Sequence, residues 1–343
     1  MEEDVNLRKK AELSLGGGIK LPKGFVMPYR LSRSTAGPGA GSSSAVFSFG
    51  KYRVKKGVSY DSGEFELHDE GGVLSLTRSG LPFLSGVDIK PVVYHCPEQA
   101  FFNLDQRCMY NCAFCASPRL DRNVTKGLTP ESIVKMVKDA MDTKKVGSVS
   151  LTSGVVDSVD ETVKRMTDTV HALRGEFPDI PIGVEPYVSS DSHILALKEA
   201  GADEIKMNLE AATDDIFKRV CPELDRDGIF RLLSSAVGIF GRGRVTSNMI
   251  FGLGETDDEL KDAVERLCEM EVIPTLRALR YNAYNGESLK AAIGDVPKVT
   301  PDRALSVARM LKACLERHDL DSRECHTMCI ECTCCDLVPF RDV

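Results

Sequence analysis

The stretch "AFFNLDQRCMYNCAFC", from Ala100 to Cys115, joins a short apolar strand pattern to three closely spaced cysteines. Five more segments of the same strand type follow it: "VGSVSLTS", "IPIGVEP", "ADEIKMNLE", "VTSNMIFGL" and "TLRALRYNAY". Helical patterns separate most of them, and some carry start signals, such as Thr129 as N-cap with Pro130 in the first turn. Six strands that alternate with helices predict a parallel β/α array, closed as a barrel or wound as an open sheet. We expect a partial (β/α)6 TIM-like barrel of the α/β class.

The chemically unusual residues fall where these strands end. Ligands of parallel β/α folds collect at the carboxyl ends of the strands, so these residues are expected on one face, around one mouth. In strand order they are Cys108 to Cys115, "LTSG", Glu185, Asn208 with Glu210, "GLGET", and Tyr281 to Tyr284.

Two extensions flank the array. Residues 1–98 contain the alternating segments "KYRVKKGV", "EFELHDEGG" and "VLSLTRSG", which predict a small set of antiparallel strands. Between them and the N-terminus, "RSTAGPGAGSSS" has the composition of a flexible linker. We therefore expect an N-terminal β-rich extension over residues 1–98, the barrel over 99–300, and a helix followed by a cysteine-rich tail over 301–343.

Composition limits the partners and the location of the protein. The chain has 343 residues, of which 42% are hydrophobic and 28% charged, and its formal net charge is −7. An acidic surface does not favour phosphates, so we expect neither a nucleic acid nor an anionic membrane as partner. No apolar run reaches the length of a membrane span, and "MEEDVNLRKK" lacks the apolar core of a secretory signal. We expect a cytoplasmic protein.

Twelve cysteines in a reducing compartment indicate metal or redox chemistry, because structural disulfides are rare there. The spacing of Cys108, Cys112 and Cys115 gives too few ligands, too close together, for a structural zinc site. It suits an iron–sulfur cluster, in which three thiolates leave one iron of a four-iron cube open. Zinc with a distant fourth ligand is the alternative. Three isolated cysteines are expected to pack in the core: Cys221, Cys268 and Cys314.

In this loop the sequence resembles the radical S-adenosylmethionine (SAM) superfamily, with the aromatic Phe114 just before the last cysteine. The resemblance implies a [4Fe–4S] cluster whose open iron binds the amino and carboxylate groups of SAM. It also implies reductive cleavage of the sulfonium to a radical that abstracts hydrogen from an unactivated carbon. The cofactor then supplies the reactivity, and the protein supplies position and exclusion of water.

The segments "LTSG", "NLEAATDDIFKRVCP" and "SNMIFGLGETDDEL" are similar to segments of lipoyl synthases and, less closely, biotin synthases, which insert sulfur. The resemblance implies that Ser153 and Gly154 approach the methionine amino group and that Asn208 and Glu210 bond that group or the ribose. The alternative for Asn208 and Glu210 is a helix cap and a solvated acid. The residues that the resemblance implies for SAM binding are Tyr110, Phe114, Ser153, Gly154, Glu185, Asn208, Glu210, Met249, Gly252 and Gly254. For Met249 and the glycines, turn geometry and core packing explain as much.

A second run, "CHTMCIECTCC", repeats the C-x3-C-x2-C spacing at Cys325, Cys329 and Cys332. Lipoyl synthases consume an auxiliary [4Fe–4S] cluster as sulfur source; its cysteines precede the radical loop, and a serine ligand stands in a C-terminal Arg-Ser-Ser-Tyr motif. This chain lacks that arrangement. We predict that the three tail cysteines hold the auxiliary cluster and that Ser34, beside Arg33, supplies a removable oxygen ligand. Alternatives for the fourth ligand are Ser32, Cys96, Cys334 and Cys335, with His95 and His326 weaker still; zinc or redox thiols are alternatives for the whole site.

The resemblance implies a sulfur-insertion enzyme, most similar to archaeal-type two-component lipoyl synthases. Its substrate would be an octanoyl chain on a carrier protein or peptide, with a ferredoxin or flavodoxin as electron donor and a second synthase component as a further partner. Arg277, Arg280 and Tyr281 are candidates to bind substrate carbonyls or an acidic carrier, and a solvated arginine face is the alternative for each of them. The competing interpretations are a radical SAM enzyme of cofactor or peptide maturation, whose second cluster transfers electrons or binds substrate, and a non-catalytic iron–sulfur or zinc scaffold.

Overall fold

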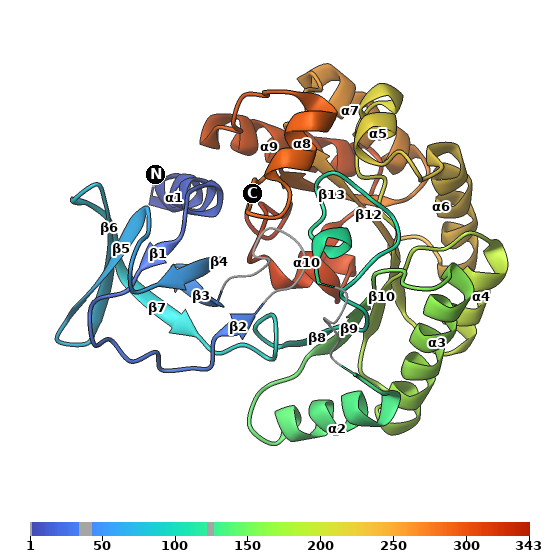
Figure 1. Ribbon diagram of the computed structural model, residues 1–343, viewed down its shortest axis with the longest axis horizontal. Helices are drawn as coiled ribbons and strands as arrows, with labels where there is room; N and C mark the ends of the chain where they lie inside the picture. Colours follow the sequence, from blue (N-terminus) through green and yellow to red (C-terminus); the bar gives the residue numbers. More distant parts are fainter. Residues whose placement is uncertain (1, 34–42, 122–126) are drawn as a thin grey trace.

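The computed structural model describes residues 2–33, 43–121 and 127–343. A helix, α1 (Glu2–Leu15), opens the chain and packs against a β-rich unit and against the late helix α9 (Pro301–Arg317). Figure 1 shows this unit beside a larger body in which helices surround parallel strands. The strands of the β-rich unit are β1 (Ile19–Lys20), β2 (Ser32–Arg33), β3 (Ser43–Phe49), β4 (Tyr52–Ser59), β5 (Phe65–Glu70), β6 (Val73–Arg78) and β7 (Leu81–Lys90).

These strands form a nearly closed ring. Their order is β2-β3-β4-β1-β5-β6-β7. Because β3 also pairs with β7, the six strands from β3 to β7 in this order close into a ring, and β2 lies outside it. The pairs expected from the alternating segments are antiparallel, as predicted. The short strand β1 differs, because it pairs parallel with both β4 and β5. Apolar side chains such as Phe47, Tyr52 and Phe65 fill the ring and meet α1.

The larger body has the predicted parallel array. Six strands lie in the order β13-β12-β11-β10-β9-β8, and all neighbours are parallel. The N-cap predicted at Thr129 is present, with Ser132 completing a capping box. The strands are β8 (Gln99–Asn103), β9 (Ser148–Thr152), β10 (Ile182–Glu185), β11 (Glu204–Lys206), β12 (Val245–Phe251) and β13 (Ile273–Ala278).

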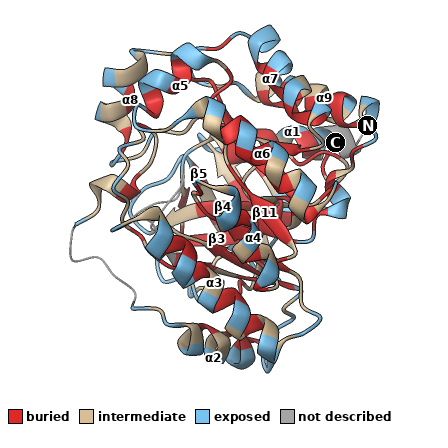
Figure 2. Ribbon diagram, turned by 90° about the vertical axis from the view of Figure 1, so that its right-hand side faces the viewer, coloured by how far each residue is buried: buried red, intermediate tan, exposed pale blue. Residues whose placement is uncertain are grey.

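Helices cover the outer face of this partial barrel, and its apolar core lies between the two layers (Figure 2). In β9, Val149 and Leu151 belong to that core, while Ser148 and Ser150 alternate with them and face the inside of the barrel. The helices are α2 (Pro130–Met141), α3 (Val159–Glu176), α4 (Asp191–Glu199), α5 (Asp214–Val220), α6 (Arg226–Phe240), α7 (Asp257–Glu269), α8 (Gly286–Ile293), α9, and the short α10 (Met328–Cys332).

The last residues of the chain are fixed by the first helix. Lys10 on α1 is fully buried, and its ammonium donates to both carboxylate oxygens of Asp342 at 2.7 Å and to the carbonyl of Thr333 at 2.6 Å. A buried charge is tolerated only when it is paired and hydrogen-bonded in this way. The cysteine-rich tail is therefore held between α1 and the barrel.

Candidate functional site

The loop after β8 brings Cys108, Cys112 and Cys115 together. Cys112 acts electrostatically on both other thiols, and burial raises the pKa of Cys108 and raises that of Cys115 to about 11. Arg119 closes the loop by donating to the carbonyls of Cys112 at 2.9 Å and Cys115 at 2.6 Å. Three neighbouring thiols in one loop fit the donor set of an iron–sulfur cluster.

Gly154 lets this loop lie against the end of β9. Its N–H donates to the carbonyl of Asp105 at 2.8 Å, and a Cβ at this position would overlap the carbonyl oxygen of Arg107. The next residue, Val155, accepts a hydrogen bond from the N–H of Met109 at 2.6 Å. Gly154 is thus explained first by close packing of two backbones, while the neighbouring Ser153 hydroxyl bonds only locally, to the carbonyl of Gly154 at 2.9 Å.

The two aromatic residues of the loop are anchored differently. The ring of Tyr110 packs against Tyr187, with centroids 4.8 Å apart. Phe114 packs against the main core, and its carbonyl accepts from the Asn285 side chain at 3.0 Å. A fourth thiol also lies here, because Cys221 is buried after α5 and hydrogen-bonds with Cys112. Cys221 is a core residue as predicted, but its contact with the loop has no signal in the sequence, since it stands 109 positions after Cys112 along the chain.

Charged and amide side chains meet at the ends of β10 and β11. Asn208 donates to the carboxylate of Glu185 at 2.9 Å, and Lys206 pairs with the same carboxylate at 3.0 Å. Burial opposes ionisation of Glu185, but the ammonium of Lys206 and the bond from Asn208 outweigh it and lower its pKa. The Asn208 carbonyl oxygen also accepts from the N–H of Asn248 on β12 at 3.2 Å. Asn208 is therefore a bridge between strands and not a helix cap.

Glu210 has an unusual backbone. Its φ is 66°, in a region that residues with a side chain seldom adopt, and its backbone forms a parallel bridge with Met249 of β12. Burial raises the pKa of its carboxyl group to about 7. Backbone strain and a perturbed acid together are typical of functional sites, so the alternative of a simple solvated acid does not describe Glu210.

The remaining SAM-binding candidates have structural explanations. Met249 is fully buried in the core. Gly252 and Gly254 have φ of 93° and 115°, which other residues rarely adopt, and a Cβ on Gly252 would collide with Val299. The Glu255 carboxylate accepts from the N–H groups of Gly252 at 2.6 Å and of Leu253 at 2.9 Å, and fixes this turn.

The tail contacts the inner side of most barrel strands (Figure 1). Glu204 on β11 accepts from the N–H groups of His326 at 2.8 Å and Thr327 at 3.1 Å. Ser150 on β9 accepts from the N–H of Met328 at 3.2 Å, and the Gln99 side chain on β8 donates to the Met328 carbonyl at 3.3 Å. A Cβ on Gly183 in β10 would overlap the Thr327 side chain. Residues 326–328 therefore enter the barrel from the amino ends of its strands.

Beyond this entry, Cys329 lies between two cationic side chains of the barrel. Its sulfur is 3.1 Å from a guanidinium nitrogen of Arg277 and 3.9 Å from the ammonium of Lys206. Lys206 also pairs with Glu185, which bonds Asn208. A continuous set of polar contacts thus leads from a tail thiol to the residues at the barrel mouth.

Three further thiols form a compact group made of Cys96, Cys332 and Cys334. The hydrogen bonds from Cys334 and from Cys96 lower the pKa of Cys332, while the same bonds and burial raise the pKa of both donors. The Cys335 thiol is close enough to interact electrostatically with Cys332. This group, together with Cys335, has the thiol-only donor set of a second iron–sulfur cluster or of zinc.

The structure does not bring Cys325 to this group. Cys325 is buried where the tail enters the barrel, and its thiol donates to the carbonyl of Gly243, ahead of β12, at 3.4 Å. The side chains that act most on it are carboxylates and guanidiniums, those of Glu204, Arg244, Glu324 and Arg341. Cys325 thus has other neighbours than Cys332, whose hydrogen-bonded thiols are Cys96 and Cys334, while Cys329 and Cys332 both act electrostatically on Cys335.

Of the two serines predicted as oxygen ligands of the second cluster, the structure describes only Ser32. Ser34 lies outside the described residues, and of Arg33 only the backbone, in β2, is described. Ser32 is buried, and its hydroxyl accepts from the ammonium of Lys55 at 2.9 Å. Lys55 in turn contacts the His95 ring at 3.0 Å and acts electrostatically on Cys96. Ser32 is thus the described serine that lies next to the compact thiol group.

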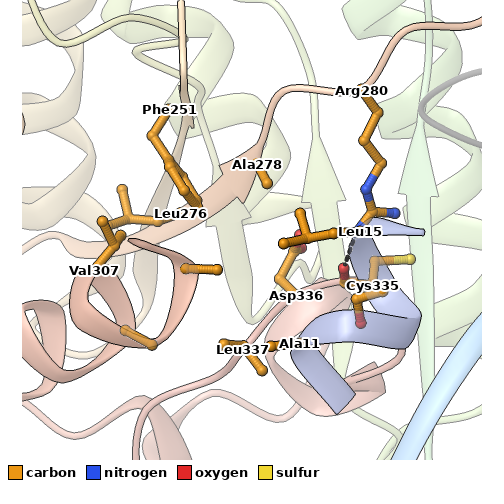
Figure 3. A pocket seen from close by; sticks show the side chains of 13 residues that line it. Ala11, Leu15, Phe251, Leu276, Ala278, Arg280, Val307, Cys335, Asp336 and Leu337 are labelled. Atoms are coloured by element: carbon orange, nitrogen blue, oxygen red, sulfur yellow. Dashed lines mark hydrogen bonds between the residues drawn. The ribbon is translucent and has the colours of Figure 1, made fainter. Parts of the chain in front are cut away.

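Arg277 and Arg280 both bind residues of the C-terminal tail. Arg277 pairs with Asp336 at 2.9 Å, and Arg280 donates to the carbonyl of Cys335 at 2.6 Å. Figure 3 shows Arg280 reaching Cys335 beside an apolar seam between α1, β13, α9 and the tail. The cavity in this seam measures about 20 Å³, enough for one water molecule. The two arginines thus bind side-chain and backbone groups of the tail, whereas Tyr281 is exposed, and their role toward a substrate or an acidic carrier stays a prediction.

Comparisons with known proteins agree with this geometry. Residues 103–267 match the model of the radical SAM superfamily. The chain is similar to a biotin synthase of Macrococcus caseolyticus (strain JCSC5402), with 23% identity over 212 residues, 60% of each chain. It is also similar to a lipoyl synthase of Nocardioides sp. (strain ATCC BAA-499 / JS614), with 30% identity over 197 residues, 53% of this chain and 59% of the relative. The chain thus spans about three fifths of the length of these curated relatives.

Among solved structures, methylornithine synthase (PylB) superposes with a TM-score of 0.53 at 17% identity, over 63% of this chain and 62% of that one. Likeness at this identity supports the fold, including the predicted partial barrel. In the part of the chain that the structure describes, we find no helix with the length and apolar character of a membrane span. The loop, the barrel and the matching family model agree that residues 103–267 form a radical SAM domain.

Proposed function

We propose that this protein is a radical SAM enzyme with two thiol-bound metal centres, which inserts sulfur at an unactivated C–H bond. The observation that carries the proposal is the course of the tail. It runs inside the barrel, with Cys329 in contact with Lys206 and Arg277, and so joins the second thiol group to the barrel mouth.

Cys108, Cys112 and Cys115 would hold the [4Fe–4S] cluster, which supplies reductive cleavage of SAM when bound. The residues around it would orient and shield the bound SAM. Glu185 stays ionised through Lys206 and Asn208 and offers a carboxylate oxygen to a cationic amino group. Glu210, with its raised pKa, can accept or donate a hydrogen bond near neutral pH.

The second centre would be held by Cys96, Cys332 and Cys334, with Cys329 or Cys335 in reach of the barrel interior. Ser32, fixed by Lys55, is the described candidate for an oxygen ligand; Ser34 remains a prediction. An oxygen ligand binds iron–sulfur clusters more weakly than a thiolate, and its departure would make room for substrate.

Sulfur insertion is favoured over other radical chemistry because the chain resembles biotin and lipoyl synthases and carries a second thiol group, which the tail connects to the barrel interior through Cys329. We infer a lipoyl synthase-like reaction on a protein-bound octanoyl chain, in the cytoplasm, with a low-potential electron donor and a second synthase component as partners. The competing function is radical maturation of a cofactor or peptide, with the second centre transferring electrons or binding substrate.

The experiment that tests the proposal is anaerobic reconstitution followed by counts of iron and sulfide, with SAM cleavage measured under a strong reductant. Wild type is expected to hold about eight irons, and Cys332→Ala about four while it still cleaves SAM. Loss of sulfide during turnover would support sulfur insertion, and its retention would favour the maturation enzyme. About four irons in both proteins would refute the second cluster, and absence of SAM cleavage in wild type would favour a scaffold protein.

A further inference from the structure

A group of metal-binding side chains lies outside the barrel, away from both thiol groups. Within the described parts of the chain, Glu265, Cys314 and His318 place one donor atom each within 4.8 Å of one another. Glu265 stands on α7, Cys314 lies on α9, and His318 directly follows α9. The two helices pack side by side, so the group spans a helix–helix seam.

A second thiol adjoins this group. Cys268 lies one turn after Glu265 on α7, and its thiol is within hydrogen-bonding reach of the Cys314 thiol. Both sulfurs are buried, with Cys314 fully and Cys268 98% shielded from solvent. The sequence thus offers a donor pair at i, i+3 on one helix and a pair at i, i+4 on its neighbour, and such spacings put each pair on one helix face.

We propose that Glu265, Cys314 and His318 form a structural binding site for a divalent, borderline-soft metal ion such as Zn²⁺, with the adjoining Cys268 thiol moving in as the fourth ligand. Two thiolates, one imidazole and one carboxylate are the ligand types that zinc takes in tetrahedral sites. Softer thiolate donors disfavour Mg²⁺ and Ca²⁺, which select oxygen ligands.

The surroundings hold the donors in position. One carboxylate oxygen of Glu265 pairs with Arg317, which leaves the other, 2.9 Å from the His318 ring nitrogen, directed into the group. Arg242 donates to the carbonyls of His318 at 2.6 Å and Asp319 at 2.8 Å, and pairs with Glu271 just after α7. The ends of both helices are therefore tied together by one guanidinium.

Two of the proposed ligands are partly exposed, so a metal ion can reach the group from solvent. The side chains of Glu265 and His318 are 25% and 26% exposed, while the two thiols lie behind them. An ion can thus enter from solvent through the carboxylate and the imidazole. The metal would replace the Glu265–His318 contact and pin α9 to α7, and α9 also carries the contact with α1.

The test uses the holoprotein with its iron–sulfur sites loaded, so that the other clustered thiols are occupied. The protein is incubated with Zn²⁺ and passed through gel filtration, and zinc per chain is measured together with the Tm. We expect about one zinc per chain in wild type, loss of that zinc in His318→Gln and in Glu265→Gln, and retention in the control Glu316→Gln on α9, whose exposed side chain pairs with Lys312. Zinc should raise the Tm of wild type but not of His318→Gln.

His318 and Glu265 are partly exposed, so these variants are expected to fold, and the difference between them and Glu316→Gln isolates this site from zinc bound elsewhere. Equal zinc contents in wild type and His318→Gln would overturn the proposal and leave an ordinary ion pair beside two packed thiols. A disulfide between Cys268 and Cys314 in the holoprotein, detected as protection from alkylation that reductant removes, would overturn it as well.

Discussion

Two segments of this chain share one cysteine spacing and have different structures. In the loop after β8, the spacing C-x3-C-x2-C brings Cys108, Cys112 and Cys115 together. In the tail, the same spacing leaves Cys325 at the entry to the barrel and carries Cys329 and Cys332 into it on α10. Met328, at φ 59°, reverses the backbone between them. The same cysteine spacing therefore brings the three thiols together in the irregular loop after β8 but not in the tail, where part of the backbone is helical.

The loop lies close to β9 at Gly154, and the tail lies close to β10 at Gly183. Substitution of these two glycines should disrupt the loop and the tail separately, and we expect the largest effects from it. Gly154→Ala forces a Cβ into the Arg107 carbonyl, and Gly183→Ala forces one into the Thr327 side chain. Crowding of this kind costs about 1–3 kcal/mol or displaces the segment. Gly154→Ala should lose SAM cleavage together with about four irons. Gly183→Ala should also lose about four irons but should keep SAM cleavage. Iron counts and cleavage assays measure both.

The matched control is Gly175→Ala on α3, where a Cβ meets no neighbouring atom. It should leave iron and SAM cleavage unchanged and stabilise the helix slightly. Equal loss of SAM cleavage in Gly154→Ala and Gly183→Ala would mean that the two segments are not independent.

The tail, unlike the loop, relies on a buried ion pair with the N-terminal helix. Lys10→Met leaves the Asp342 carboxylate buried without its cation and should lower the free energy of unfolding by about 3–5 kcal/mol. Chemical denaturation measures this loss. Lys9→Met, one residue earlier on the same helix and partly exposed, should cost less than about 1 kcal/mol. Similar losses in the two variants would refute the role of Lys10.

At the barrel mouth, the two acids should respond to pH in opposite directions. The pKa of Glu210 is raised to about 7. Its carboxyl group therefore favours the folded state while it is protonated, and this contribution to stability is lost as the pH rises from about 4.5 through 7. Glu210→Gln should therefore stabilise the iron-free protein at pH 8, by at most about 3 kcal/mol, and not at pH 4. The pKa of Glu185 is lowered, so Glu185→Gln should destabilise at pH 8.

Denaturation curves at the two pH values measure these differences. A loss of stability in Glu210→Gln at pH 8 would show that the ionised Glu210 is stabilised by a partner, against the environment described for it.

The smallest effect is expected at Cys325, and it sharpens the comparison between the two cysteine runs. Cys325→Ala removes a buried thiol that touches only a backbone carbonyl among its hydrogen-bond partners in the described chain. It should cost about 1–2 kcal/mol in unfolding free energy and leave the iron content unchanged. Loss of about four irons would restore the sequence-based ligand set.

Much of the fold followed from local patterns. The strand segments, their order and the cap at Thr129 could be predicted because alternation, apolar runs and capping residues act over a few neighbours. The parallel pairing of β1 could not, because two residues carry no periodicity of their own. At the site, the cysteine loop was identifiable from spacing, whereas Lys206 and Cys221 carried no local signal and join the site only through the barrel.

The barrel class and the first set of three thiols can be read from short-range patterns in the sequence. Which other cysteines meet depends on how distant segments pack. Cys96 and Cys332 lie in segments that are distant along the chain, and they come together because α1 holds the tail and because Glu204, Ser150 and Gly183 admit it between the strands. Such contacts depend on the packing of whole elements, which no local pattern encodes.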